Sequence, residues 1–240
     1  MPANKIHTRI LSAQRKKKPQ LAVLIDPDKF NAELVKMCRP GEVSYFFVGG
    51  SELSNGDMEK TLRSIRKLSK IPVVIFPGDE RQLSARADAV LFLSLLSGRN
   101  PDYLIGKQVL AAPVIRKKKL ECVATAYLLV NGNKKSVTQK VTQTEPLHSL
   151  KEIKDTALAA ELLNFSAVYL EAGSGARTQV PAKIIRAVRK TIKLPLLVGG
   201  GIDSAARART ALRAGADIVV VGNALEKTPV LLKDLVPLFK

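Results

Sequence analysis

Short apolar runs alternate along the whole chain with segments in which apolar residues recur every three or four positions. The first run, Leu21–Ile25, is unbroken, and such runs are typical of parallel strands that helices cover on both faces. Most runs are followed closely by glycine or a polar residue, which ends a strand and opens a turn. We expect strands at 21–25, 43–48, 72–76, 89–94, 120–130 and 167–170, and within 195–202 and 216–225.

The amphipathic segments predict the helices between these strands. In the segment 147–163 the apolar residues fall on one side of a helix, at positions 147, 150, 153, 157, 158 and 162. Only a short polar segment follows the third strand, so the third βα unit looks degenerate, and the polar stretch 134–145 fits no element well. Further helices are expected at about 4–17, up to 38, at 58–68, from 102, from 181, at 204–214 and after 229. Eight strands alternating with helices indicate an α/β fold, a (β/α)8 or TIM barrel that forms one domain over residues 1–240.

Length and composition agree with this fold. Barrels of this kind commonly run to about 250 residues, and 46% of the 240 residues are hydrophobic. No apolar run reaches the roughly 18 residues of a membrane-spanning helix, and the first residues lack the apolar core of a signal peptide. We therefore expect a cytoplasmic protein. Cys38 and Cys122 stand alone, which favours neither a metal site nor a disulfide.

The charge of the chain is strongly positive, with 39 Lys and Arg against 21 Asp and Glu, a net +18. Such an excess attracts phosphates of any kind, in nucleic acid, in anionic lipid or in a small diphosphate. The basic runs 15–18 and 116–119 each end just before a strand, on the face of a barrel away from its active site, where cations suit the ends of helices. Trp is absent and no recognition-helix or RNP-type motif is present, so we expect no nucleic-acid partner.

The stretch 167–176, AVYLEAGSGA, concentrates the candidate chemistry. It starts as a strand, is expected to expose the carboxylate of Glu171, and turns through Gly173, Ser174 and Gly175. Tyr169 and Glu171 lie two positions apart and therefore point to the same side of the strand. Backbone N–H groups of a glycine turn can approach an anion closely. The alternative is a strand edge followed by an ordinary glycine turn.

Two more glycine turns follow the seventh and eighth strands, at 199–201 and at Gly222-Asn223. Each lies just before a helix, so that exposed N–H groups and a helix dipole meet at one point. Loops after these two strands frequently form the phosphate site of barrel enzymes. The sequence therefore predicts a phosphorylated ligand beside the turn at 173–175, although this feature does not define the reaction.

A second polar site is expected after the first two strands. Asp26 and Asp28 follow the first strand, and a carboxylate at a barrel mouth needs a partner. Mg²⁺ usually takes few protein ligands, so one carboxylate and substrate phosphates suffice to hold it. We assign Asp26 to the metal, whereas Asp28 is expected to cap the next helix or to pair with Lys29. Ser51, after the second strand, either caps the following segment or assists the metal.

Two anion sites at one mouth, with Glu171 between them, suit a transfer reaction. A hydroxyl group of a phosphate monoester would attack a carbon that carries diphosphate. Glu171 would act as the general base, Tyr169 would orient the acceptor, and Mg²⁺ would stabilise the departing diphosphate.

The chain resembles the geranylgeranylglyceryl phosphate synthases and their bacterial PcrB relatives over nearly its whole length. The resemblance rests on LIDPDK (24–29), FVGGS (47–51), SLLSGRNPDYLIG (94–106), YLEAGSGA (169–176), VGGGI (198–202) and VGNALE (221–226). The resemblance implies Mg²⁺-dependent ether formation between sn-glycerol 1-phosphate and a polyprenyl diphosphate. It implies Asp26 and Ser51 as metal residues and Glu171 and Tyr169 as catalytic residues. The implied substrate-binding residues are Tyr169, Leu170, Glu171, Ala172, Gly173, Ser174, Gly175, Gly200, Gly201, Gly222 and Asn223.

One departure from the family bears on the donor. Some members carry a Lys two positions before the aspartate, where this chain has Leu24. That places it nearer the archaeal and Bacteroidetes-like group, which resembles users of geranylgeranyl diphosphate, than the heptaprenyl-using type. The resemblance also implies a homo-oligomer, a dimer or a hexamer. The excess of Lys and Arg suits peripheral contact with an anionic membrane surface.

A prenyl tail needs an apolar groove, and its candidate walls are Phe76, Phe92, Leu95, Leu96 and Tyr103, although each also suits plain core packing. Tyr103 is a candidate for limiting the length of the tail. Two other functions remain open: a different sugar-phosphate barrel enzyme, such as an epimerase or isomerase, and a basic phosphate- or nucleic-acid-binding protein on a barrel that has lost its activity. A requirement for magnesium would distinguish a prenyltransferase from the first of these functions. A steeply salt-dependent affinity for RNA would favour the second.

Overall fold

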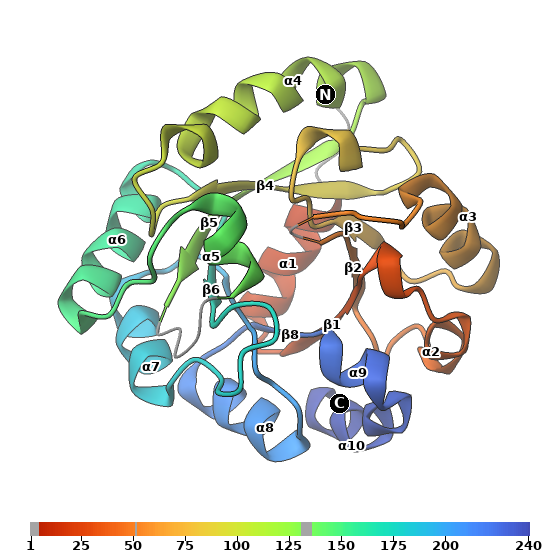
Figure 1. The fold of residues 1–240 in the computed structure, drawn as a ribbon. Coiled ribbons are helices and arrows are strands. Elements are labelled where there is room, and N and C mark those ends of the chain that lie inside the picture. Colours follow the sequence, from red (N-terminus) through yellow and green to blue (C-terminus); the bar gives the residue numbers. More distant parts are fainter. Residues whose placement is uncertain (1–4, 51, 131–135) are drawn as a thin grey trace.

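Eight parallel strands close into a barrel in the order β1 to β8, and helices surround it, as Figure 1 shows for the computed structural model. The structure describes residues 5–50, 52–130 and 136–240. Each strand pairs with the next, and β8 pairs with β1. The strands are β1 (Gln20–Ile25), β2 (Tyr45–Val48), β3 (Val73–Ile75), β4 (Ala89–Leu95), β5 (Glu121–Leu129), β6 (Ala167–Glu171), β7 (Leu196–Gly199) and β8 (Ile218–Val221). The predicted TIM barrel is confirmed.

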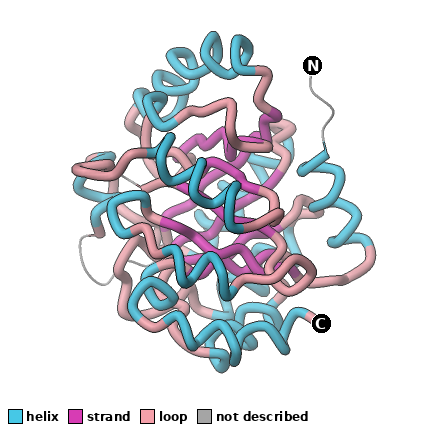
Figure 2. The backbone as a smooth tube through the Cα atoms, turned by 90° about the vertical axis from the view of Figure 1, so that its right-hand side faces the viewer, coloured by secondary structure: helices cyan, strands magenta, loops and turns pink. Residues whose placement is uncertain are grey.

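The helices lie outside the strands, which form the inner layer of the molecule (Figure 2). The α-helices are α1 (Lys5–Arg15), α2 (Ala32–Met37), α3 (Met58–Leu68), α4 (Lys107–Lys118), α5 (Val137–Thr142), α6 (Leu150–Leu162), α7 (Ala182–Thr191), α8 (Ala205–Ala214), α9 (Asn223–Lys227) and α10 (Leu232–Leu235). Short 3-10 turns are η1 (Pro27–Lys29), η2 (Glu80–Gln82), η4 (Pro229–Leu231) and η5 (Val236–Phe239), and η3 (Asp102–Gly106) is a π-helical turn. None of the helices in the described ranges is long and apolar enough to cross a membrane.

The strands place alternate side chains in two separate apolar layers. In β4, Leu91 and Leu93 pack in the interior of the barrel, whereas Val90 and Phe92 pack in the layer between the barrel and its helices. This period of two is the expected geometry of a strand. It explains why the strands read as continuous apolar runs in the sequence.

Helix α1 closes the end of the barrel opposite the mouth. Its Ile6 and Ile10 pack against the residues that fill the barrel interior. The carboxylate of Glu121 accepts hydrogen bonds from the backbone N–H groups of Ile6 (3.0 Å) and His7 (2.7 Å), which the first turn of a helix leaves free. Ligands therefore approach the barrel interior from the other end.

The third βα unit lacks an α-helix. Only the 3-10 turn η2 lies between β3 and β4, which confirms the expectation that this unit is degenerate. Helix α4, which follows β4, packs against η2 and β4 (Figure 1). Helix α4 therefore lies against β4 and η2, beside the unit that has no α-helix of its own.

The stretch 134–145, which fits no element well in the sequence, holds α5, a short helix over the barrel mouth (Figure 1). Helix α6 begins at Leu150, three residues later than expected, because the N–H group of Leu147 bonds to the carbonyl of Leu129 and extends the sheet. Ser149 then caps α6. The expected turn at 131–133 lies outside the described residues. Cys38 and Cys122 are free thiols, as expected.

Candidate functional site

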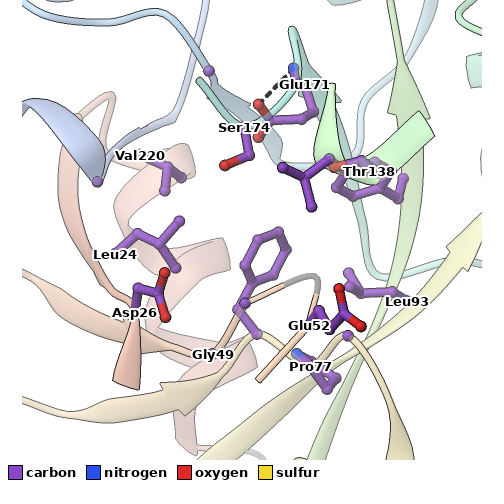
Figure 3. Close-up of a pocket in the computed structure, with 18 of the residues that line it drawn as sticks. Leu24, Asp26, Gly49, Glu52, Pro77, Leu93, Thr138, Glu171, Ser174 and Val220 are labelled. Atoms are coloured by element: carbon purple, nitrogen blue, oxygen red, sulfur yellow. Dashed lines mark hydrogen bonds between the residues drawn. The ribbon is translucent and has the colours of Figure 1, made fainter. Parts of the chain in front are cut away.

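A large cavity of about 720 Å³ opens at the C-terminal ends of the strands. Figure 3 shows Glu171 and Ser174 on one side of this opening and Asp26 and Glu52 on the opposite side, with apolar side chains such as Leu24 and Val220 between them. The predicted acid–base residue and the predicted metal residue therefore line the same cavity.

Glu171 is the last residue of β6, and its side chain is turned into the barrel. The expectation that it is exposed is wrong, because only 5% of its surface is accessible. Its Oε1 accepts a hydrogen bond from the N–H group of Gly173 at 2.9 Å. Burial raises the pKa of the carboxyl group, while Tyr169 and the Gly173 N–H group oppose this shift by favouring the charged form.

Tyr169 points to the same side of β6 as Glu171, as the strand geometry predicts. A Cβ atom at Gly199 would meet both the Tyr169 hydroxyl and, at 3.0 Å, the Glu171 carboxylate. The Tyr169 hydroxyl is buried, and among the described residues it has no hydrogen-bond partner of good geometry. Burial and the neighbouring Glu171 charge raise the pKa of this phenol well above its usual range. It therefore stays protonated and can donate to a ligand.

Two further aromatic rings surround Tyr169 at the base of the cavity. Phe76 lies 5.4 Å from it between ring centroids, and Tyr127 lies 5.4 Å away at 85°, an edge-to-face contact. Such arrangements suit the charge distribution of aromatic rings. No motif in the sequence marks Tyr127 as part of the site. It sits two positions before the end of β5, where alternation with Leu129 places it in the interior.

The glycines of the predicted phosphate site lie together around Glu171. Gly173, Gly175, Gly200 and Gly201 have φ values of 103°, 74°, 78° and 66°, a region that side chains with a Cβ rarely adopt. These four residues line the cavity together with Ser174, Gly222 and Asn223. A Cβ at Gly175 would lie 4.0 Å from the side-chain amide of Asn223. The turns after β6, β7 and β8 thus form one cradle.

Leu170 and Ala172 do not offer their side chains to this cradle. Both side chains pack in the layer between the barrel and the helices. Among the eleven predicted substrate-binding residues, these two do not line the cavity. The family motif implies a continuous binding segment, whereas a strand presents only alternate side chains to one face.

Arg207, which sequence analysis did not single out, ties two of the glycine turns together. Its Nη1 donates to the backbone carbonyls of Gly201 (2.7 Å) and Arg177 (3.1 Å) and to the carboxylate of Asp203 (2.8 Å). A Cβ at Gly201 would overlap the backbone of Thr178. The loops after β6 and β7 are therefore packed backbone against backbone, and Arg207 joins them. No motif signalled this arginine, one of many in the chain.

Asp26 occupies the opposite side of the cavity. One carboxylate oxygen accepts from the N–H group of Asp28 (3.0 Å) and so caps η1, and the other binds Lys29 Nζ (2.9 Å). Asp28 instead accepts from the backbone N–H groups of Ser54 (2.9 Å), Asn55 (3.0 Å) and Gly56. The prediction that Asp28 is the cap is therefore wrong, because its side chain turns outward and holds the loop after β2.

Glu226 is a second carboxylate beside Asp26, and sequence analysis gave it no role. Its Oε1 accepts from the backbone N–H group of Asp26 (3.3 Å), and its Oε2 lies 3.9 Å from Lys29 Nζ. Burial raises the pKa of this carboxyl group, an effect that the Lys29 charge opposes. Glu226 is the last residue of the motif VGNALE, and its place in this motif is the feature of the sequence that could have marked it as a site residue.

No group of three or more His, Cys, Asp or Glu side chains suited to a metal occurs within residues 5–50, 52–130 and 136–240. Ser51, the second predicted metal residue, lies outside the described residues. The adjacent Gly50 is held by Gln82, whose side chain donates to the Gly50 carbonyl (2.9 Å) and accepts from the N–H groups of Gly50 (3.4 Å) and Gly78 (3.2 Å). Gln82 thereby fixes the loops after β2 and β3 to each other.

The cavity has an apolar branch that leaves the barrel. Besides the inward-facing Leu93, it is lined by Val90 and Phe92, which point outward from β4, and by Ala111 and Ile115 of α4. It therefore passes over the ends of β3 and β4 and continues between the sheet and α4, where the third unit has no helix.

Four of the five predicted groove residues line this cavity: Phe76, Phe92, Leu95 and Tyr103. Leu96 does not, because it faces a separate hollow near α6. The Tyr103 hydroxyl donates to the carbonyl of Val141 in α5 (3.2 Å). Helix α5, which contributes Val137, Thr138 and Val141 to the lining, thus covers the cavity.

The family model described as PcrB family matches residues 13–236 of the chain. Geranylgeranylglyceryl phosphate synthase of Chitinophaga pinensis is 41% identical over 97% of this chain and 94% of its own length. The enzyme of the same name from Flavobacterium johnsoniae is 43% identical over 92% and 93%.

The crystal structure of (S)-3-O-geranylgeranylglyceryl phosphate synthase from Thermoplasma acidophilum in complex with its substrate sn-glycerol-1-phosphate superposes with a TM-score of 0.91. It is 29% identical to this chain, and the match covers 98% of each chain. The family model, the relatives and the structural match therefore all point to the same family. The chain is an enzyme that belongs to the PcrB family.

Proposed function

We propose that the protein is a prenyltransferase that joins sn-glycerol 1-phosphate to geranylgeranyl diphosphate through an ether bond, with Mg²⁺, in the synthesis of ether phospholipids. The observation that carries this proposal is the layout of one cavity. A glycine cradle around a buried carboxylate, a second carboxylate opposite, and an apolar branch meet at the barrel mouth. The names of the relatives and the substrate bound in the neighbouring structure support the choice of reaction and acceptor.

The cradle suits the phosphate of the acceptor. Its turns after β6, β7 and β8 bring backbone N–H groups to one place, and no Cβ obstructs the approach at Gly175, Gly200 and Gly222. Ser174 adds a hydroxyl group on the same rim. The Glu171 carboxylate lies among these turns, so that the glycerol hydroxyls of a bound acceptor would be close to it.

In the proposed reaction a hydroxyl oxygen of the acceptor attacks C1 of the prenyl diphosphate. A C–O ether bond forms, the bond between C1 and the diphosphate oxygen breaks, and diphosphate leaves with the electron pair. The hydroxyl proton moves to Glu171. The raised pKa of this carboxylate makes it a stronger base than an exposed glutamate. Tyr169, which keeps its proton, orients the acceptor through a hydrogen bond.

The residues around Asp26 fit Mg²⁺. The donors at this side of the cavity are hard carboxylate oxygens, and Asp26 is paired with the exposed side chain of Lys29, which a metal ion can replace. Asp26 would hold the ion, with Ser51 as the second expected ligand. When bound, Mg²⁺ would neutralise charge on the departing diphosphate. Lys29 remains beside the site and binds the same diphosphate.

The apolar branch suits the prenyl tail. Its walls between β4 and α4 carry no charge, whereas Lys107 at its rim pairs with Glu80 at 3.5 Å. A cavity of about 720 Å³ falls within the range of small-molecule sites, about 300–1,000 Å³. With the diphosphate at Asp26 and the tail in this branch, C1 would face the cavity that Glu171 lines from the opposite side.

The test is incubation of the protein with sn-glycerol 1-phosphate, Mg²⁺ and prenyl diphosphates of several lengths, with the products identified by mass spectrometry. We expect geranylgeranylglyceryl phosphate as the preferred product and none from the Glu171→Gln variant. A heptaprenyl product would change the donor and leave the reaction in place. Absence of product with every donor, from protein that still binds glycerol phosphate, would refute the proposal and favour a sugar-phosphate enzyme.

A further inference from the structure

Helix α4 and the turn before it carry an exposed apolar stripe. Ile105, Val109 and Leu110 are 60%, 62% and 57% exposed. The next two residues of the stripe, Ala112 and Pro113, are exposed as well. Positions three and four apart share one side of a helix, so these residues form one surface, which we call the α4 stripe. Contiguous exposed apolar patches mark sites of interaction.

Basic residues continue this surface at the C-terminal end of α4, and one exposed carboxylate, Asp102, lies at its other end. Arg116, Lys117 and Lys119 are exposed at the C-terminal end of α4, and the segment 107–119 contains no Asp or Glu. An apolar face beside Lys and Arg is the pattern of helices that lie in the interface of an anionic membrane. The surface is therefore complementary to anionic lipid in both polarity and charge.

The opposite side of α4 faces the apolar branch of the cavity. Gln108 and Ala111 are buried and line the branch together with Ile115. One helix thus separates the branch from the exposed stripe. In Figure 1, α4 lies at the edge of the molecule outside β4.

We propose that the α4 stripe docks on the surface of an anionic lipid bilayer. The apolar residues enter the headgroup region, and the basic residues bind lipid phosphates. For the prenyl donor this inference rests on the proposed function, because a lipid diphosphate residing in that bilayer would enter the branch that α4 borders.

Helix α6 offers a matched comparison. Leu158, Leu162 and Leu163 are 40%, 74% and 65% exposed and form a second apolar surface of similar size. Helix α6 carries three carboxylates, Glu152, Asp155 and Glu161, against two lysines, Lys151 and Lys154, and Lys151 pairs with Asp155 at 2.7 Å. The helix has no excess of positive charge, so its apolar surface lacks the attraction to anionic lipid that the α4 stripe has.

The test is co-sedimentation, without substrates, with vesicles of phosphatidylcholine alone or mixed with phosphatidylglycerol. The stripe variant is Ile105→Gln, Val109→Gln, Leu110→Gln, and its control is Leu158→Gln, Leu162→Gln, Leu163→Gln. We expect binding to the anionic vesicles, weaker at high salt, a loss of roughly 10-fold or more in the stripe variant and no loss in the control. A third variant combines Arg116→Gln, Lys117→Gln and Lys119→Gln. It should bind the anionic vesicles more weakly, and its binding should depend less on salt.

Equal binding by the stripe variant and the wild type would refute the proposal. A change in oligomeric mass in the stripe variant, with vesicle binding retained, would assign the stripe to a contact between copies of this chain and would also refute it. Assays in detergent with solubilised donor separate the two proposals. Loss of vesicle binding with full activity in detergent supports docking, and vesicle binding through α4 without any prenyl transfer would refute the proposed function alone.

Discussion

Gly200 lies so close to Glu171 that a Cβ atom on it would overlap the Oε1 atom of the carboxylate. The same Cβ would lie 2.8 Å from the backbone nitrogen of Ala172. The glycine after β7 therefore makes room for the acid–base group after β6, in addition to forming the phosphate cradle.

Replacement of Gly200 by Ala should displace Glu171 and lower kcat by about 100-fold, the effect of a displacement of about 1 Å in a catalytic group. Gly41→Ala is the matched control, because Gly41 also has a positive φ, 92°, but a Cβ atom on it would meet no other atom within 4 Å. Both variants should lose stability from backbone strain, measured by thermal unfolding. Equal kcat values in the two would show that the contact with Glu171 has no role.

Glu171→Gln should abolish turnover and stabilise the folded protein at neutral pH. Burial raises the pKa of Glu171, so the folded protein holds this proton to a higher pH than the unfolded chain does. Its ionisation therefore costs stability above the unfolded value of about 4.3, and a rise of one pH unit in the pKa corresponds to about 1.4 kcal/mol. The variant avoids this cost.

The measurement is thermal unfolding across pH. The difference in Tm between Glu171→Gln and the wild type should be absent below the unfolded pKa, grow as the pH rises through the folded pKa, and stay constant above it. In the wild type, kcat/KM should rise over the same interval as the base loses its proton. A variant that is less stable at neutral pH would contradict the assigned shift.

Asp26→Ala should raise the Mg²⁺ concentration needed for half-maximal activity, on the order of 10-fold or more. It should weaken use of the prenyl diphosphate and leave the affinity for glycerol phosphate, measured by calorimetry, unchanged. Asp28→Asn is the control: it weakens the bonds that hold the loop at 54–56, so it should lower Tm without changing the magnesium dependence. An unchanged magnesium dependence in Asp26→Ala would remove Asp26 from the metal site.

Ala111→Phe should shorten the preferred prenyl donor. Ala111 is buried and lines the apolar branch, whereas its neighbour Ala112 is exposed on the other side of α4. A ring at position 111 would fill the branch, and the product distribution measured by mass spectrometry in detergent should move to shorter chains. Ala112→Phe should leave the distribution as in the wild type. The same shift in both variants would mean that the tail lies elsewhere.

Much of the fold could be predicted from the sequence because the strands are continuous apolar runs that end in glycine or aspartate. The strand positions, the TIM barrel and the degenerate third unit are confirmed. Helix α5 was missed because the segment 134–145 is short and polar, and its position over the mouth depends on bonds from distant residues such as Tyr103.

The site residues that belong to sequence motifs could be predicted. Features of the site that depend on packing between distant segments could not. The glycine turns, Glu171 and Asp26 fall on one cavity, as expected. The burial of Glu171, the bridging role of Gln82 and the clamp of Arg207 depend on contacts between loops far apart in sequence. The oligomeric state, the cytoplasmic location, the magnesium requirement and the extent of the domain stay predictions.

The third βα unit has no α-helix, and this separates the site of the reaction from the site of the lipid tail, which a regular barrel would keep together. In a regular barrel side chains fill the interior, so the reacting groups and the whole ligand share the mouth. Here the wall beside β3 and β4 lies open to a slot under α4. Under the proposed function, substitutions along α4 and β4 can change the length of the prenyl donor that the enzyme prefers. Those around Glu171 and the glycine turns can remain fixed, so that one chemistry serves membranes of different composition.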